Sequence, residues 1–136
     1  MVKPIVHDML FLSIPSQAAT EADLPVAQDL LDTLEANKLG CVGLAANMIG
    51  VSKCIIAFVD DDKHMAMLNP VIVEKKGEYD TEEGCLSLSG VRKTKRYEKI
   101  KVQYQNLKMQ KKTRTFYGFT AQIIQHEVDH CMGILI

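Results

Sequence analysis

The residues with the clearest chemical potential in this sequence are two histidines near its C-terminal end. His126 and His130 enclose Glu127 in the pattern His-Glu-x-x-His. One helical turn of 3.6 residues places both imidazoles on the same face, where they can hold one metal ion with Glu127 directed toward a bound water. The plain alternative, a solvated polar helix face, would need this spacing to arise by coincidence among only four histidines. The pattern therefore predicts a metal site.

Two imidazoles leave such a site incomplete, because a catalytic metal usually takes three protein ligands and keeps one position open. The remaining candidate ligands are Cys85, Cys41, Cys54, Cys131, His64 and His7. Cys54 lies in an apolar run and Cys131 on the expected last helix, where cysteine is most often a small core residue. Cys85 differs, because it follows an expected turn at 78–81 and directly follows a glycine that allows close backbone approach beside the thiol. We therefore favour Cys85 as the third ligand.

The elements that must position these residues follow from hydrophobic periodicity and turn residues. Apolar residues recur at helical spacing over 23–38, and short β-branched or alternating runs indicate strands. The last helix is expected to begin at Thr120 as N-cap and to stop at Gly133. The expected order is a helix over 23–38, strands over 53–59 and 65–74 joined by a turn at 60–63, a strand at 100–104, a turn at 106–108, a strand near 110–116, and a helix over 120–132. This order favours an α+β fold with a largely antiparallel sheet packed around the C-terminal helix.

Composition limits the classes of protein that the chain can belong to. Its 136 residues, 47% of them hydrophobic, suit one globular domain over 1–136. Sixteen basic and seventeen acidic residues give a net charge of −1, which argues against nucleic-acid binding and against an anionic membrane surface. The apolar run at 54–59 is far shorter than the ~20 residues of a membrane span, and no secretory signal opens the chain. We expect a cytoplasmic protein with reduced cysteines.

Three short motifs together resemble those of the peptide deformylase family. Gly43-Leu-Ala-Ala46 is similar to most of the family's first motif, Glu83-Gly-Cys-Leu-Ser87 to the second, and Gln125-His-Glu-Val-Asp-His130 to the third. They occur in the family's order and at its approximate spacing. The resemblance implies a peptide deformylase-like fold.

The resemblance also implies a site and a reaction. One divalent metal, iron(II) in the native enzyme with zinc or nickel as substitutes, would be held by Cys85, His126 and His130. The substrate would be an N-formylmethionyl peptide of a nascent chain, and Glu127 would act as general acid and base while a metal-activated water attacks the formyl carbon. The backbone N–H of Leu86 would stabilise the oxyanion. Formate and a free N-terminus would result.

The same resemblance suggests how a peptide would be bound. Val42 and Gly43 would offer backbone hydrogen bonds to a substrate lying beside them like an added strand. Ile123, one turn before His126, would line an apolar pocket for methionine, although ordinary core packing also explains an isoleucine there. Arg96 matches an arginine that lies near the substrate in the family.

The first motif departs from the family pattern at two positions. Met48 occupies the place of a glutamine that donates to the oxyanion, and a thioether cannot donate a hydrogen bond. Asn47 can donate but points elsewhere if the segment is extended. Cys41 replaces a glycine, and we read it as a small residue tolerated in a strand. We expect reduced deformylase activity for this reason.

Two other functions compete with the metal-dependent deformylase. A deformylase-like protein that binds metal and peptide but hydrolyses weakly or not at all is favoured by Met48. A zinc endopeptidase also uses His-Glu-x-x-His, but such enzymes usually recruit His or Glu as third ligand, which the Cys85 motif argues against.

Overall fold

The computed structural model describes residues 1–136 and contains one antiparallel sheet and two main helices. The elements follow the chain as α1 Met9–Leu12, η1 Glu21–Asp23, α2 Leu24–Ala36, β1 Gly43–Ala45, η2 Ala46–Ile49, β2 Ile55–Asp60, β3 Lys63–Gly84, β4 Val91–Gln105, β5 Lys111–Tyr117 and α3 Gly118–Cys131, where η denotes a short 3-10 helix. The expected helices and the strands around 53–59, 65–74, 100–104 and 110–116 are confirmed.

The sheet has five strands in the order β1-β2-β3-β4-β5, and every neighbouring pair is antiparallel. Each strand pairs with the next one along the chain, so short turns suffice. The expected turn between β2 and β3 is present, with Asp61 in the left-handed region at φ 55°. The predicted α+β fold with a largely antiparallel sheet is confirmed.

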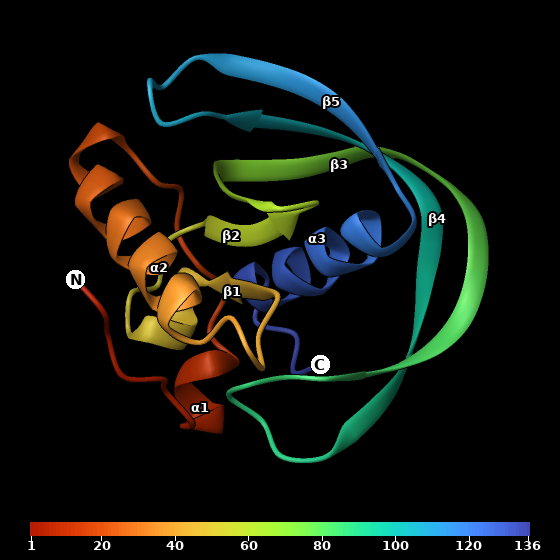
Figure 1. Ribbon diagram of the computed structural model, residues 1–136, viewed down its shortest axis with the longest axis horizontal. Helices are drawn as coiled ribbons and strands as arrows, with labels where there is room; N and C mark the ends of the chain where they lie inside the picture. The colour runs from red at the N-terminus through yellow and green to blue at the C-terminus, as the bar shows by residue number, and fades with distance from the viewer.

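The strand β3 is much longer than its hydrophobic pattern predicted. The expected turn at 78–81 is wrong, because these residues pair with β4 in continuous register from Glu78 opposite Tyr97 to Gly84 opposite Val91. Most side chains in this stretch are exposed, so no hydrophobic alternation marks it as a strand. The long β3–β4 hairpin curves around α3 and brings the segment after Gly84 back to that helix (Figure 1).

The two main helices are held by apolar faces. In α2, Pro25 occupies the first turn, and Ala27, Leu30 and Leu34 are fully buried at helical spacing.

The helix α3 begins at Gly118, before Thr120, and its N-cap is Tyr117 in an extended conformation, so the predicted N-cap is wrong. It ends at Cys131.

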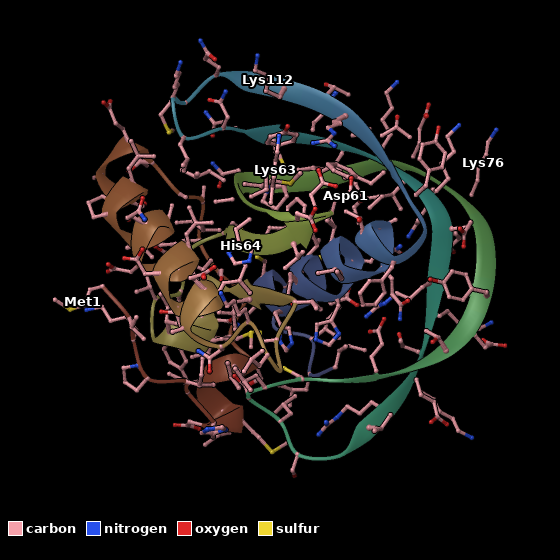
Figure 2. The ribbon with its side chains drawn as sticks, in the orientation of Figure 1. Met1, Asp61, Lys63, His64, Lys76 and Lys112 are labelled. Atoms are coloured by element: carbon pink, nitrogen blue, oxygen red, sulfur yellow. The ribbon has the colours of Figure 1, made fainter.

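A single cluster of 26 buried residues forms the core between the sheet and the helices. The helix α3 lies in the middle of the molecule, enclosed by the curved strands (Figure 1). It buries not only Ile124 but also polar residues that a plain core helix would keep in water, namely Gln125, His126, Glu127 and His130. Lysines such as Lys76 and Lys112 point outward from the strands (Figure 2). No helix of the structure has the length and apolar character needed to cross a membrane.

Candidate metal centre and substrate pocket

Cys85, His126 and His130 meet at one point between the end of β3 and the helix α3. Their candidate ligand atoms all lie within 4.8 Å of one another. The Cys85 Sγ is 3.3 Å from His130 Nε2, which is 3.1 Å from His126 Nε2. The predicted ligands are therefore brought together, with both histidines buried and Cys85 half-buried.

The Glu83 carboxylate orients the first of these histidines. The His126 Nδ1 lies 2.8 Å from Glu83 Oε1. Burial alone would raise the pKa of the Glu83 carboxyl, but hydrogen bonds, with that of His126 first, lower its pKa to about 2. An ionised carboxylate accepts only, so His126 Nδ1 donates and its Nε2 faces the other two ligands.

A buried arginine holds the same carboxylate from the other side. The Arg96 guanidinium donates to both oxygens of Glu83 at 2.7 to 3.1 Å and to Asp129 Oδ2 at 2.7 Å. Gln122 Nε2 donates to Glu83 Oε2 at 2.9 Å. The structure thus places Arg96 in a buried charge network and not on the pocket wall, where substrate contact was expected.

The donor set fits a divalent ion. The two facing ring nitrogens cannot both carry a proton at 3.1 Å. Burial opposes protonation of His126, but hydrogen bonds to Cys85 and Glu83 outweigh it and raise its pKa to about 10, whereas burial and the neighbouring His126 lower the pKa of His130 to about 3. A metal ion would displace the remaining proton, because imidazole ligates in its neutral form. One thiolate with two imidazoles suits iron(II), zinc or nickel.

Glu127 lies beside this cluster and is only 4% exposed. Its carboxyl oxygen Oε1 has no hydrogen-bond partner in the chain. Burial raises the pKa of Glu127 to about 7, although the nearby His126 opposes the shift. A carboxyl group held in this way is suited to exchange a proton with a reacting group.

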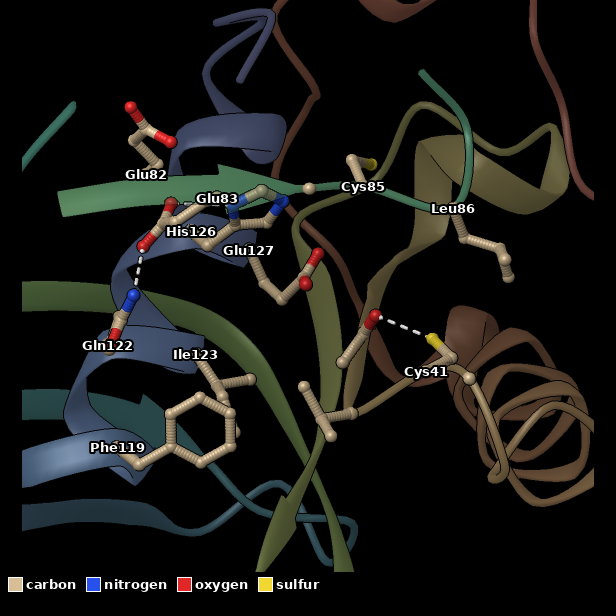
Figure 3. Close-up of a pocket in the computed structure, with 14 residues that line it drawn as sticks. Cys41, Glu82, Glu83, Cys85, Leu86, Phe119, Gln122, Ile123, His126 and Glu127 are labelled. Atoms are coloured by element: carbon tan, nitrogen blue, oxygen red, sulfur yellow. Dashed lines mark hydrogen bonds and ion pairs between the residues drawn. The ribbon is translucent and has the colours of Figure 1, made fainter. Parts of the chain in front are cut away.

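A pocket of about 250 Å³ opens next to the cluster. Figure 3 shows the Glu127 carboxylate near its middle, with Ile123 and Phe119 on one side and Cys41 on the other. The predicted residues among its lining are Val42, Gly43, Cys85, Leu86, Ile123, His126 and Glu127. Three predicted residues do not line it, namely Met48, Arg96 and His130. No role was predicted for Phe119 and Gln122. Gln122 stands one helical turn before His126, which was an available signal, whereas Phe119 falls outside the helix expected over 120–132 and lies in α3 only because this helix begins at Gly118.

Only the start of the first motif, Cys41 to Gly43, lines the pocket. A Cβ added to Gly43 would lie 2.7 Å from Ile123 Cγ2 and 2.8 Å from Glu127 Oε2, so a larger residue would force these side chains or β1 to shift. Met48 is 1% exposed in η2, and its Sδ accepts a hydrogen bond from the Ala45 N–H at 3.4 Å. Asn47 Nδ2 donates to the His130 carbonyl oxygen at 2.9 Å, so its amide group binds α3.

Comparison with known proteins identifies the family. Residues 7–136 match the family model described as Polypeptide deformylase. A peptide deformylase of Clostridium beijerinckii is 57% identical over 136 residues, which cover 100% of both chains. The chain belongs to the peptide deformylase family. Peptide deformylase 2 of Clostridium acetobutylicum is 36% identical over 90% of this chain and 82% of that relative.

Solved structures of peptide deformylases share this fold. The Thermotoga maritima enzyme superposes with a TM-score of 0.88 at 28% identity, covering 99% of this chain and 95% of that one. The Met-Ala-Ser-bound class I type b enzyme from Acinetobacter baumannii gives a TM-score of 0.89 at 29% identity, covering 99% and 97%. As a peptide deformylase, the chain is a metal-dependent amidohydrolase with a Cys/His/His site for one divalent ion.

Glu83 is the functional residue that sequence reasoning passed over in this deformylase. It stands two residues before Cys85, so on an extended strand both side chains point to the same face. That spacing was the available signal. Its partner Arg96 could not be assigned to it, because Arg96 stands thirteen positions further along the hairpin.

Proposed function

We propose that this peptide deformylase removes the formyl group from N-formylmethionyl peptides such as nascent chains. The observation that carries the proposal is the meeting of Cys85, His126 and His130 at the edge of a pocket that Glu127 lines, with one Glu127 carboxyl oxygen lacking a hydrogen-bond partner. The bound Met-Ala-Ser in the Acinetobacter baumannii enzyme, a deformylated methionyl peptide, supports this substrate class.

Cys85, His126 and His130 would hold the metal, with iron(II) as native ion and zinc or nickel as substitutes. A divalent ion bound there supplies Lewis acidity toward water and the formyl oxygen. Glu127 would take a proton from the attacking water and return it to the leaving amine, since its buried carboxyl has an oxygen free to accept. The Leu86 N–H, which makes no backbone hydrogen bond, would donate to the developing oxyanion.

The substrate main chain would pair with the outer edge of β1 at Val42 and Gly43, because β1 has a sheet neighbour on one side only. Ile123 and Phe119 offer an apolar wall for the methionine side chain beside Glu127. Arg96 would act through Glu83 as a positioning residue, since its guanidinium is buried away from the pocket.

Met48 favours a second candidate, a protein that binds metal and peptide but hydrolyses weakly. Its thioether bonds the Ala45 N–H and offers no donor to an oxyanion. We expect reduced activity and not its absence, since Glu127, the Leu86 N–H and the metal ligands would still act.

Formate release from formyl-Met-Ala-Ser tests both candidates. The chain is loaded separately with iron(II), zinc and nickel under anaerobic conditions, and formate is measured with and without a chelator. We expect release with at least one metal and none after chelation. Binding of Met-Ala-Ser without formate from any metal form would establish the binding protein instead.

A further inference from the structure

The Cys41 side chain is hydrogen-bonded to the main chain of β1 at Gly43, a residue that lines the pocket. Its Sγ donates to the Gly43 carbonyl oxygen at 3.1 Å (Figure 3). Cys41 is 8% exposed and lines the pocket with Gly43 and Glu127. Cys41 thus belongs to the edge of the core cluster, outside the group of candidate metal ligands, and its sulfur makes a hydrogen bond at the pocket wall.

The bonded carbonyl belongs to the free edge of the sheet. The Val59 N–H donates to the carbonyl oxygen of Val42, the residue opposite it, at 2.9 Å, so this carbonyl points toward β2. In an antiparallel ladder the next pair, Gly43 opposite Phe58, directs its N–H and C=O groups away from the partner strand. The Gly43 carbonyl thus faces the side of β1 on which a peptide would be added.

The Cys41 thiol stays protonated at neutral pH and can therefore keep donating its hydrogen bond to Gly43. Burial raises the pKa of Cys41 to about 11, although the bond to Gly43 opposes the shift, so the sulfur keeps its proton at neutral pH. A carbonyl oxygen has two lone pairs, and the thiol takes one of them. The other lone pair stays available to a substrate N–H, with the peptide plane already fixed.

We propose that Cys41 is a substrate-positioning residue, whose thiol fixes the Gly43 carbonyl at the edge of β1 so that it accepts a main-chain N–H of the bound peptide. This proposal rests on the proposed function, because it assumes that the substrate pairs with β1. It assigns a role to a position that had been read as a tolerated small residue.

The test compares Cys41→Ala and Cys41→Ser with the natural chain at equal metal content. Calorimetry gives the Kd of Met-Ala-Ser, and formate release gives kcat and KM for formyl-Met-Ala-Ser. Loss of one weak hydrogen bond should raise Kd and KM of Cys41→Ala about fivefold with kcat unchanged. Cys41→Ser keeps a donor and should recover most of this loss. Cys54→Ala, which removes a half-buried thiol outside the pocket, is the control and should bind peptide normally.

Other results would overturn the proposal. Unchanged or tighter peptide binding by Cys41→Ala would mean that the thiol is idle or competes with the substrate. Equal losses in Cys41→Ala and Cys41→Ser would assign the effect to packing. If the natural chain releases no formate, the proposed function fails, but the Kd comparison still decides the role of Cys41.

Discussion

Glu83 and His126 are joined by a hydrogen bond of 2.8 Å between a carboxylate and a ring nitrogen that is remote from the metal-binding atoms. The end of β3 therefore carries Glu83, which orients one ligand, and the chain directly after β3 supplies another ligand, Cys85. Because Glu83 and Cys85 are separated by one position where the extended chain leaves β3, their side chains share the face toward α3. The geometry of the centre depends on how that strand end is held against the helix.

Replacing Arg96 by methionine should destabilise the protein. Arg96 is buried, and without it the Glu83 carboxylate keeps its charge but loses three of its donor contacts. Breaking a buried pair by removing one partner costs about 3–5 kcal/mol. Urea unfolding should show this loss, whereas Arg114→Met, which removes an exposed pair with Asp60, should cost about 1 kcal/mol or less. Equal losses in the two variants would show that the Glu83 network does not depend on Arg96.

Replacing Cys85 by alanine should abolish stoichiometric metal binding. Only two imidazole ligands remain in this variant. Without the thiolate they bind a divalent ion too weakly to retain one ion per chain. Elemental analysis of the purified variant measures this directly. Cys54→Ala is the matched control and should retain about one ion per chain. Full metal content in Cys85→Ala would show that another residue is the third ligand.

Much of the fold could be predicted because hydrophobic periodicity reports burial. The helix at 24–36 has a regular apolar face, and β2 and the start of β3 are apolar runs separated by a turn of aspartates. The far half of β3 could not be recognised, because most of its side chains are exposed and its buried residue, Glu83, is polar, so that only main-chain pairing with β4 defines it. The start of α3 was missed because it is set by the end of β5 and not by a capping side chain.

The metal ligands could be predicted for a different reason, since ligand chemistry restricts residue type and spacing. No comparable restriction marks Arg96, whose partners Glu83 and Asp129 are known only once the hairpin reaches α3. For Met48, the sequence shows the absent donor, but only the fold shows that the sulfur bonds the Ala45 N–H.

Replacing Glu127 by glutamine should preserve the metal and remove turnover. The amide has the shape of the carboxyl group but cannot carry the proton from water to the leaving amine. Loss of a positioned acid and base typically costs ~10²–10⁴ in rate. Formate release and metal content are measured on the same sample, with the exposed Glu74→Gln as control. Normal turnover in Glu127→Gln would remove this residue from the mechanism.

Replacing Gly43 by alanine should damage the site without harming the rest of the fold. The new Cβ would meet Ile123 Cγ2 at 2.7 Å and Glu127 Oε2 at 2.8 Å, so that either β1 or the carboxylate must shift. A displacement of about 1 Å can cost on the order of 10² in rate. Gly40→Ala is the control, since a Cβ there has no neighbour within 4 Å. Equal formate release by the two variants would mean that β1 and α3 separate easily at this point.

Replacing Met48 by glutamine should increase the rate of deformylation. The side chain at this position is buried, and its Sδ accepts from the Ala45 N–H at 3.4 Å. A glutamine can accept from the same N–H through its Oε1 while its Nε2 supplies a donor toward the site. One oxyanion donor typically contributes ~10²–10³ in kcat, and because the bond strengthens in the transition state, kcat should rise more than KM falls. Both constants are measured with formyl-Met-Ala-Ser at equal metal loading, with Met48→Leu as a control that lacks any donor. Ordinary deformylase rates in the natural chain, unchanged by Met48→Gln, would show that another group already stabilises the oxyanion.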